Sequence, residues 1–211
     1  YTWEKTGAAA YAGNNSVVMR NMDYGQNGPI DDLISPVFNL KGNDSAYLSF
    51  EVAAAVYSDP RGSNTTWDTL EVLISRDCGV TGTVLYKKWG INLITDTTAD
   101  TQEFVPASSQ WRRDSINLTP YLDGGDFRII FRNITNYENN IYLDNINLVA
   151  RQTNPILAEK KVLVVPNPTS GSLSVQFLGV PDNLKGEAIS NSIGQVLARR
   201  DASDINTQNR M

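Results

Sequence analysis

Acidic side chains are the groups through which this chain could do chemistry, because it contains no histidine. The lack of histidine excludes Ser-His-Asp and Cys-His nucleophile systems, H-E-x-x-H zinc sites and imidazole proton transfer. Two carboxylates across a cleft could still hydrolyse a glycosidic bond, and Glu51, Glu71 and Glu103 are candidates for that role. No motif accompanies them, and no phosphate-binding glycine pattern is present. Catalysis is therefore not expected.

Asp144 is the acidic residue with the clearest structural requirement. It alternates in phase with Tyr142, Ile146 and Leu148, which predicts a side chain pointing toward the core. A buried carboxylate needs a partner, and three kinds stay open: backbone amides, Arg132, or a cation. Calcium prefers oxygen ligands, and the N-terminal segment supplies further carboxylates at Asp23, Asp31 and Asp32.

Aromatic residues beside turns are the other candidate site. Exposed rings could stack on the faces of sugars, whereas a buried ring is the commoner fate of tryptophan. The sequence leaves both possibilities open for Trp3, Trp67, Trp89, Trp111, Tyr57, Tyr121 and Tyr137.

The elements that must position these residues are β-strands. Apolar residues alternate with polar ones in three runs, at Leu48/Phe50/Val52, Leu70/Val72/Ile74 and Phe127/Ile129/Phe131. Alternation over short segments separated by turn residues predicts half-buried strands. We therefore expect an all-β protein with an antiparallel β-sandwich, and we expect these nine side chains to face inward.

Composition narrows the classes of partner. A net charge of −5 over 211 residues gives no basic field for nucleic acid. No apolar run reaches the roughly 20 residues of a transmembrane helix. The single cysteine, Cys78, cannot form an intramolecular disulfide and is expected to be a small buried hydrophobic residue.

A composition change divides the chain into two domains. Residues 1–149 end in an alternating strand, and residues 150–161 are polar, lack alternation and contain Pro155. The strand pattern resumes in residues 162–211. This second unit of about fifty residues is near the size at which a core alone is marginal.

Four segments of the first domain carry a family resemblance: 31–40, 46–52, 68–79 and 139–148. Together they resemble the MAM-like jelly-roll domains found before sorting domains in secreted Bacteroidetes proteins. The resemblance implies an accessory or adhesion module with a glycan or surface ligand. It also implies a structural Ca²⁺ between the N-terminal loop and the last strand, with Asp23, Asp31 and Asp144 as ligands.

The segment Ser75-x-Asp77-x-Gly79-x-Thr81 resembles an Asp-box, a hairpin turn of sequence S-x-D-x-G-x-T-W. In such a turn the aspartate accepts backbone hydrogen bonds and the glycine takes a positive φ. Gly82 stands where the tryptophan is expected. We expect a structural role for this turn.

The second domain carries two motifs, V-V-P-N-P-T-S-G at 164–171 and N-S-I-G-Q-V at 191–196. In this order and spacing they resemble the type A C-terminal sorting domain of the Bacteroidetes type IX secretion system. The resemblance implies a small Ig-like β-sandwich recognised by the secretion machinery. Its closing strands do not follow before Met211, so we expect an incomplete domain. The motif residues are Pro166, Asn167, Pro168, Gly171, Asn191, Gly194 and Gln195.

The two resemblances imply a non-catalytic C-terminal region of a larger secreted or cell-surface protein. The first domain is expected to be an accessory or adhesion module, or alternatively a carbohydrate-binding module of a secreted hydrolase or peptidase. The second domain is expected to direct the protein to the outer cell surface or beyond, after Sec export.

Overall fold

The computed structural model describes residues 2–62, 67–98, 101–152, 162–165, 174–177, 185–191 and 193–201. The chain forms two compact units, residues 1–152 and 153–211. The last strand of the first unit continues through Arg151, because Ala150 and Arg151 pair with Ala46 and Ser45. The expected linker at 150–161 was therefore wrong in its first two residues, which are strand.

The described part of the first unit contains nine strands, and that of the second contains four. The strands of the first unit are β1 (Glu4–Thr6), β2 (Ser16–Met19), β3 (Ile30–Ile34), β4 (Ser45–Ala54), β5 (Thr69–Ser75), β6 (Thr83–Trp89), β7 (Arg112–Asn117), β8 (Arg128–Ile134) and β9 (Ile141–Arg151). Short 3-10 helices lie between them at η1 (Asn21–Asp23), η2 (Gly90–Asn92), η3 (Ser108–Gln110) and η4 (Thr119–Gly124). Among the described residues, no helix is long and apolar enough to span a membrane.

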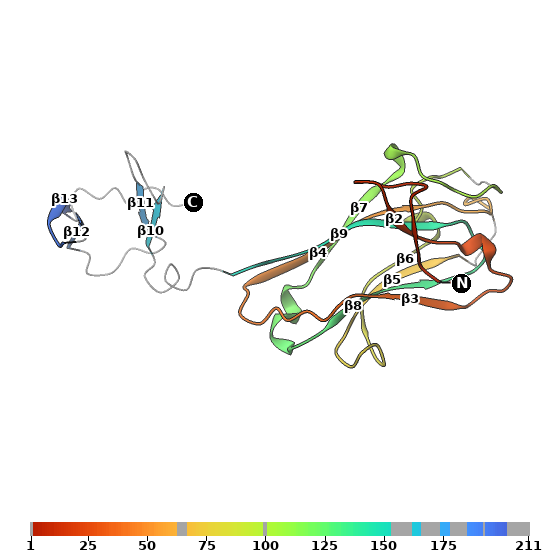
Figure 1. Cartoon of the computed structure of the whole chain (residues 1–211), viewed down its shortest axis with the longest axis horizontal. Helices are drawn as coiled ribbons and strands as arrows, with labels where there is room; N and C mark the ends of the chain where they lie inside the picture. The colour runs from red at the N-terminus through yellow and green to blue at the C-terminus, as the bar shows by residue number, and fades with distance from the viewer. Residues whose placement is uncertain are drawn as a thin grey trace. The chain divides into compact units, whose positions relative to one another are not determined.

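The strands of the first unit form two antiparallel sheets that face each other (Figure 1). Sheet A has the order β1-β2-β9-β4-β7, and sheet B has the order β3-β8-β5-β6. The pairings are nested: β2 with β9, β3 with β8, β4 with β7 and β5 with β6. This pattern is one long hairpin rolled into two layers, which defines a jelly-roll β-sandwich. The expected all-β sandwich fold is confirmed.

The core lies between the two sheets and follows the alternation of the sequence. All nine side chains expected to face inward belong to the main buried cluster: Leu48, Phe50, Val52, Leu70, Val72, Ile74, Phe127, Ile129 and Phe131. Phe50 is fully buried and makes edge-to-face contacts with Tyr86 and Phe131, at centroid distances of 5.5 and 5.1 Å. Such pairs add stabilisation beyond the buried area.

The outer face of sheet B carries a row of alternating charges across all four strands. Asp32 on β3 lies opposite Arg132 on β8, Arg132 lies opposite Glu71 on β5, and Glu71 lies opposite Lys87 on β6. Arg132 donates two hydrogen bonds of 2.8 Å to Asp32, and Lys87 lies 2.8 Å from Glu71. Opposite charges directly across from each other favour this strand register.

The described residues of the second unit form two antiparallel strand pairs. Strand β10 (Val162–Val165) pairs with β11 (Ser174–Phe177), and β12 (Gly186–Ser190) pairs with β13 (Val196–Asp201). A two-stranded hairpin has little stability alone. The four strands lie in residues 162–211, where the sequence pattern predicted strands.

We predict that Phe50→Ala lowers the free energy of unfolding by about 3–5 kcal/mol, because it removes a fully buried ring and leaves a cavity. Tyr47→Ala is the matched control, since Tyr47 lies on the same strand but is 51% exposed. That control should change stability by no more than about 0.5 kcal/mol. Urea denaturation of the full chain measures both, and equal effects would contradict the inward assignment of Phe50.

Candidate functional site

Several loops of the first unit meet at one end of the sandwich, which we call the loop end. They are segments 55–62, 67–68, 90–98, 101–111 and 135–140. They gather there because the register places strand ends side by side, with Ala54 opposite Ile141 and Thr69 opposite both Trp89 and Ile134. Loops held by a rigid sandwich are common places for binding residues.

Tyr57 and Tyr137 form a partly exposed aromatic pair at the loop end. Their ring centroids lie 5.8 Å apart with an interplanar angle of 55°, and the residues are 37% and 47% exposed. Tyr137 has a φ of +63°, a left-handed conformation that is unusual for an aromatic residue. Such a conformation costs about 1–3 kcal/mol and persists only where surrounding contacts enforce it.

Glu138 holds the loop that carries Tyr57. Its side chain is buried, and its Oε2 accepts hydrogen bonds from the backbone N–H groups of Tyr57 and Ser58, at 2.7 and 3.0 Å. The Ser58 hydroxyl donates to Oε1. Because Glu138 follows Tyr137 directly, its hydrogen bonds connect the loop that carries Tyr57 to the loop that carries Tyr137.

Asp68 holds the turn that carries Tyr137. Its Oδ1 accepts the backbone N–H of Asn136 at 2.5 Å and lies 3.4 Å from the N–H of Glu138. The Thr135 hydroxyl lies 3.5 Å from the same oxygen. One carboxylate oxygen therefore caps the residues on either side of the strained Tyr137.

The other carboxylate oxygen of Asp68, Oδ2, is buried and has no hydrogen-bond partner among the described residues. Burial raises the pKa of Asp68 to about 7; the donors at Asn136 and Glu138 oppose the rise, while the negative charge of Glu138 adds to it. Desolvation favours the neutral acid over the carboxylate. Asp68 therefore keeps its proton in the folded protein up to a pH well above the range in which a carboxyl group usually ionises.

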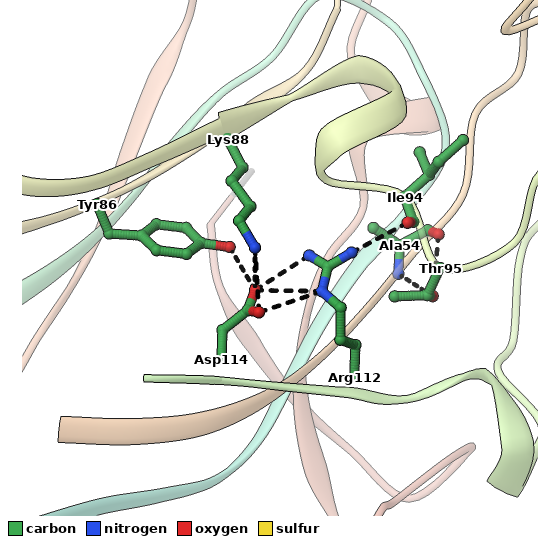
Figure 2. Close-up of polar contacts among 7 residues, drawn as sticks. All are labelled: Ala54, Tyr86, Lys88, Ile94, Thr95, Arg112 and Asp114. Carbon is green, nitrogen blue, oxygen red and sulfur yellow. Dashed lines mark hydrogen bonds and ion pairs between the residues drawn. The ribbon is translucent and has the colours of Figure 1, made fainter. Parts of the chain in front are cut away.

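A second polar cluster bridges the two sheets where their edge strands β6 and β7 meet (Figure 2). Asp114 on β7 accepts hydrogen bonds from the Tyr86 hydroxyl at 2.7 Å and from Lys88 Nζ at 3.0 Å, both on β6. Arg112 lies 3.0 Å from the same carboxylate and donates to the Ile94 carbonyl at 3.2 Å. Figure 2 shows the donors surrounding the carboxylate of Asp114. The cluster therefore links the β7 edge of sheet A to the β6 edge of sheet B.

The pKa of Asp114 is lowered although burial alone would raise it, because Arg112, Tyr86 and Lys88 hydrogen-bond the charged form. The pKa of the Tyr86 hydroxyl is raised, first by burial and then by its bond to the Asp114 carboxylate. Both shifts favour a neutral tyrosine donating to an ionised aspartate. The arrangement is a structural bridge between the sheets.

The structure gives Asp144 backbone partners. Its Oδ2 accepts the N–H groups of Tyr11 and Ala12, at 2.7 and 3.0 Å, and its Oδ1 accepts the N–H of Asn145. The expectation that Asp144 shares a face with Leu148 was wrong. Asn145 has a φ of +48° at a register shift between β4 and β9, so the inward alternation restarts after Asp144.

The other two expected calcium ligands, Asp31 and Asp23, lie on separate elements. Asp31 is on β3 of sheet B, where its side chain accepts the Tyr24 hydroxyl and its carbonyl accepts Trp3 Nε1 at 3.1 Å. Asp23 is exposed in η1, and Asp32 pairs with Arg132. Within the described ranges, no three acidic, histidine or cysteine side chains group as a metal site. Calcium binding stays a prediction.

The three candidate catalytic glutamates lie apart. Glu51 is on the sheet A strand β4, buried beside Arg113 and opposite Asp144, and burial raises its pKa. Glu71 belongs to the charged row on sheet B, and Glu103 pairs with Arg20. Glu51 and Glu71 face away from each other on different sheets, so they cannot flank one substrate bond.

The remaining aromatic candidates differ in how far they are buried. Trp3 is buried in the core, and Tyr121 is a partly buried residue that packs against this core. Trp111 packs into a small second cluster on sheet A, with its ring centroid 6.3 Å from that of Tyr142. Trp67 is half-buried, whereas Trp89 at the end of β6 is 46% exposed.

The Asp-box-like turn has the expected geometry. Both carboxylate oxygens of Asp77 accept the backbone N–H of Thr81, at 2.9 and 3.0 Å, and Gly79 has a φ of +92°. Hydrogen bonds from the Thr81 hydroxyl and N–H and from Ser75 lower the pKa of Asp77 to about 2. The expectation that Cys78 is buried was wrong: it is exposed at the turn, with a φ of +61°.

Three of the sorting-motif residues form the turn between β12 and β13. The side-chain oxygen of Asn191 accepts the N–H of Gln195 at 3.0 Å, and the N–H of Gly194 donates to the Asn191 carbonyl at 3.0 Å. Gly194 has a φ of +84°, a conformation that favours glycine. Pro166, Asn167, Pro168 and Gly171 lie outside the described residues.

Sequence reasoning named Tyr57 and Tyr137 but missed Asp68, Glu138 and Asp114. The sequence signals were weak: Asp68 directly precedes an apolar strand, and Glu138 directly precedes Asn139 and Asn140 between two strands. Acidic residues at such positions are usually solvated. Only the folded loops show that Asp68 and Glu138 are buried.

No family model and no curated protein match this chain. Among solved structures, a family 16 carbohydrate-binding module is 19% identical over 71% of this chain and 86% of its own, with a TM-score of 0.40. The K3 adhesin domain of Lys-gingipain from Porphyromonas gingivalis W83 is 17% identical over 65% and 74%, with a TM-score of 0.42. A TmCBM61 module in complex with β-1,4-galactotriose is 10% identical over 71% and 88%, with a TM-score of 0.43. The strand pairing described above defines the fold independently of these likenesses.

We predict that Asp114→Asn lowers the free energy of unfolding by about 1–3 kcal/mol at pH 7, because Arg112 and Lys88 would lose their common counter-charge. The wild-type contribution should be present above pH 3.8, the ordinary value, and disappear as the pH falls through the lower folded pKa. The variant should lack this acid dependence. Denaturation curves at several pH values test it, with the exposed Asp123→Asn as control. An unchanged acid limb in the variant would remove Asp114 as its source.

Proposed function

We propose that residues 1–152 form a non-catalytic accessory module that binds glycans through the tyrosine pair at the loop end. The observation that carries the proposal is the pairing of Tyr57 and Tyr137, two half-exposed rings in contact on neighbouring loops. Aromatic faces present apolar area with little conformational freedom to lose. A polar hydroxyl at each ring edge can add hydrogen bonds to a sugar.

The surroundings of the pair support a recognition role. Tyr137 keeps a left-handed backbone conformation. Asp68 accepts the N–H groups of Asn136 and Glu138 on either side of it, and the Glu138 side chain accepts the N–H of Tyr57. A surface loop with no function has no need of such costly support. The backbone that carries the rings is therefore held in place before a ligand arrives, which reduces the entropy lost on binding.

The placement of the three candidate glutamates supports a non-catalytic role. The glutamates that could have served in glycoside hydrolysis lie on different sheets or in ion pairs. Glycoside hydrolysis needs two carboxyl groups within about 5–10 Å on either side of one bond. We therefore propose binding without turnover, as in an accessory domain beside another activity in a larger protein.

We further propose that the second unit carries a type IX secretion signal and that the protein acts outside the cell. The support is the N-x-x-G-Q motif, in which Asn191 bonds to Gln195 and Gly194 takes a positive φ. Strand β13 is exposed along all six residues. A recognisable turn and an exposed strand are features that a translocon component could read by shape and strand addition.

We predict that Tyr57→Ala and Tyr137→Ala each weaken glycan binding by about tenfold or more, equivalent to about 1.4 kcal/mol, because each removes one ring of the tyrosine pair. The wild-type full chain is first screened on a glycan array and in native gels cast with xylan, galactan or mixed-linkage β-glucan. Tyr47→Ala, an exposed tyrosine on β4, is the matched control. Retardation that survives both loop-end substitutions would place binding elsewhere.

The secretion proposal predicts that a fluorescent protein fused to the natural region from Thr153 onward leaves the cell in a Bacteroidetes host. Asn191→Ala should reduce export, because its side chain closes the β12–β13 turn. The exposed Lys185→Ala, which precedes β12 and lies outside the turn and β13, is the control. Export that persists after deletion of the secretion apparatus would show that another route is used.

A further inference from the structure

Asp68 and Glu138 connect the two tyrosine loops through a single set of hydrogen bonds. Asp68 Oδ1 accepts the N–H groups of Asn136 and Glu138, which flank Tyr137. The Glu138 carboxylate in turn accepts the N–H groups of Tyr57 and Ser58. The geometry of one loop therefore depends on that of the other, and both depend on two buried acids.

These acids are buried to a degree that is unusual for charged groups. Asp68 is 5% exposed and Glu138 is 2% exposed, whereas aspartate and glutamate are almost never fully buried without a compensating partner. Glu138 receives its partners from segment 57–58. Asp68 has only the acceptor role of Oδ1 satisfied, while Oδ2 has no partner among the described residues.

We propose that Asp68 is a positioning residue whose protonation state controls the tyrosine pair, so that ligand binding weakens as the pH rises through neutrality. The inference rests on the proposed glycan-binding function for its biological meaning, although the loop coupling exists without it. With a proton on Oδ2, Asp68 caps the turn as a neutral acid. Without it, a second negative charge appears beside Glu138 in a buried setting.

The charged group that acts on Asp68 within the described ranges is Glu138, whose negative charge adds to the rise in pKa. The N–H groups of Asn136 and Glu138 and the Thr135 hydroxyl favour the ionised form, and burial outweighs them. Ionisation is relieved only if water reaches Oδ2 or if segment 135–138 moves away. Either change releases the left-handed conformation of Tyr137 that the cap maintains.

The direction of the pH dependence follows from the proton. The pKa of Asp68 is raised by burial to about 7 in the folded protein, against an ordinary value of 3.8. Between pH 3.8 and pH 7 the folded protein therefore holds a proton on Asp68. The stability that this proton contributes is lost as the pH rises toward 7. If only the protonated form positions the rings, the apparent Kd should rise about tenfold between pH 6 and pH 8.

The first experiment uses the full-length wild-type chain without ligand. We expect the Asp68 carboxyl carbon to titrate near pH 7 by NMR. Hydrogen-exchange protection of the Tyr57, Ser58, Asn136 and Glu138 amides, corrected for intrinsic base catalysis, should fall over the same range. A carboxyl titration near pH 4, or protection that does not change with pH, would overturn the proposal even if the protein binds glycans.

The second experiment uses Asp68→Asn, which keeps the Oδ1 acceptor and cannot ionise. Its amide protection and its retardation in xylan, galactan and mixed-linkage β-glucan gels should be independent of pH from 6 to 8. Asp123→Asn, at an exposed position in η4, should keep the wild-type profile. A pH dependence that persists in Asp68→Asn would assign the effect to another group.

The two proposals can fail separately. If no gel retards the wild-type chain but its loop amides titrate near pH 7 and the Asp68→Asn amides do not, the glycan function fails and the coupling stands. If binding occurs and is the same at pH 6 and pH 8, the coupling fails and the glycan function stands. Should Asp68→Asn not fold, the wild-type carboxyl titration and amide profile decide alone.

Discussion

Strand β4 is the element on which the rest of the first unit depends, because it pairs on both sides. It joins β7 at one edge and β9 at the other, and Leu48, Phe50 and Val52 fill the space between the sheets. The nested pairing cannot slip by one residue without turning this apolar set to solvent. The same register sets where β4 ends, and therefore where the loop carrying Tyr57 begins.

Polar groups complete the sandwich at the places that apolar packing leaves open. Asp114, Tyr86 and Lys88 join the edge strands of the two sheets, and Arg132 links charges across the outer face of sheet B. Asp144 ties the N-terminal loop to β9 through backbone amides. Each of these carboxylates has donors that match its charge, which is the condition for burying it at moderate cost.

The loop end differs from these structural clusters in two respects. Asp68 is buried with one oxygen unpartnered among the described residues, and it supports a tyrosine in a left-handed conformation. A fold optimised for stability alone would exclude both features, because each raises the energy of the native state. Their coincidence beside two half-exposed rings is the physical reason for proposing recognition at this end of the sandwich.

The sequence by itself determined the strands and the core, because alternation with period two is local and one face of each strand must be buried. It predicted all nine inward residues, the Asp-box-like turn and the positive φ of Gly79. Tertiary structure alone decided the side-chain environments. The register shift at Asn145 reversed the face expected for Leu148 relative to Asp144, and loops distant in sequence buried Asp68 and Glu138. Burial of a loop residue depends on which other loops cover it, and strand pairing between distant segments decides that.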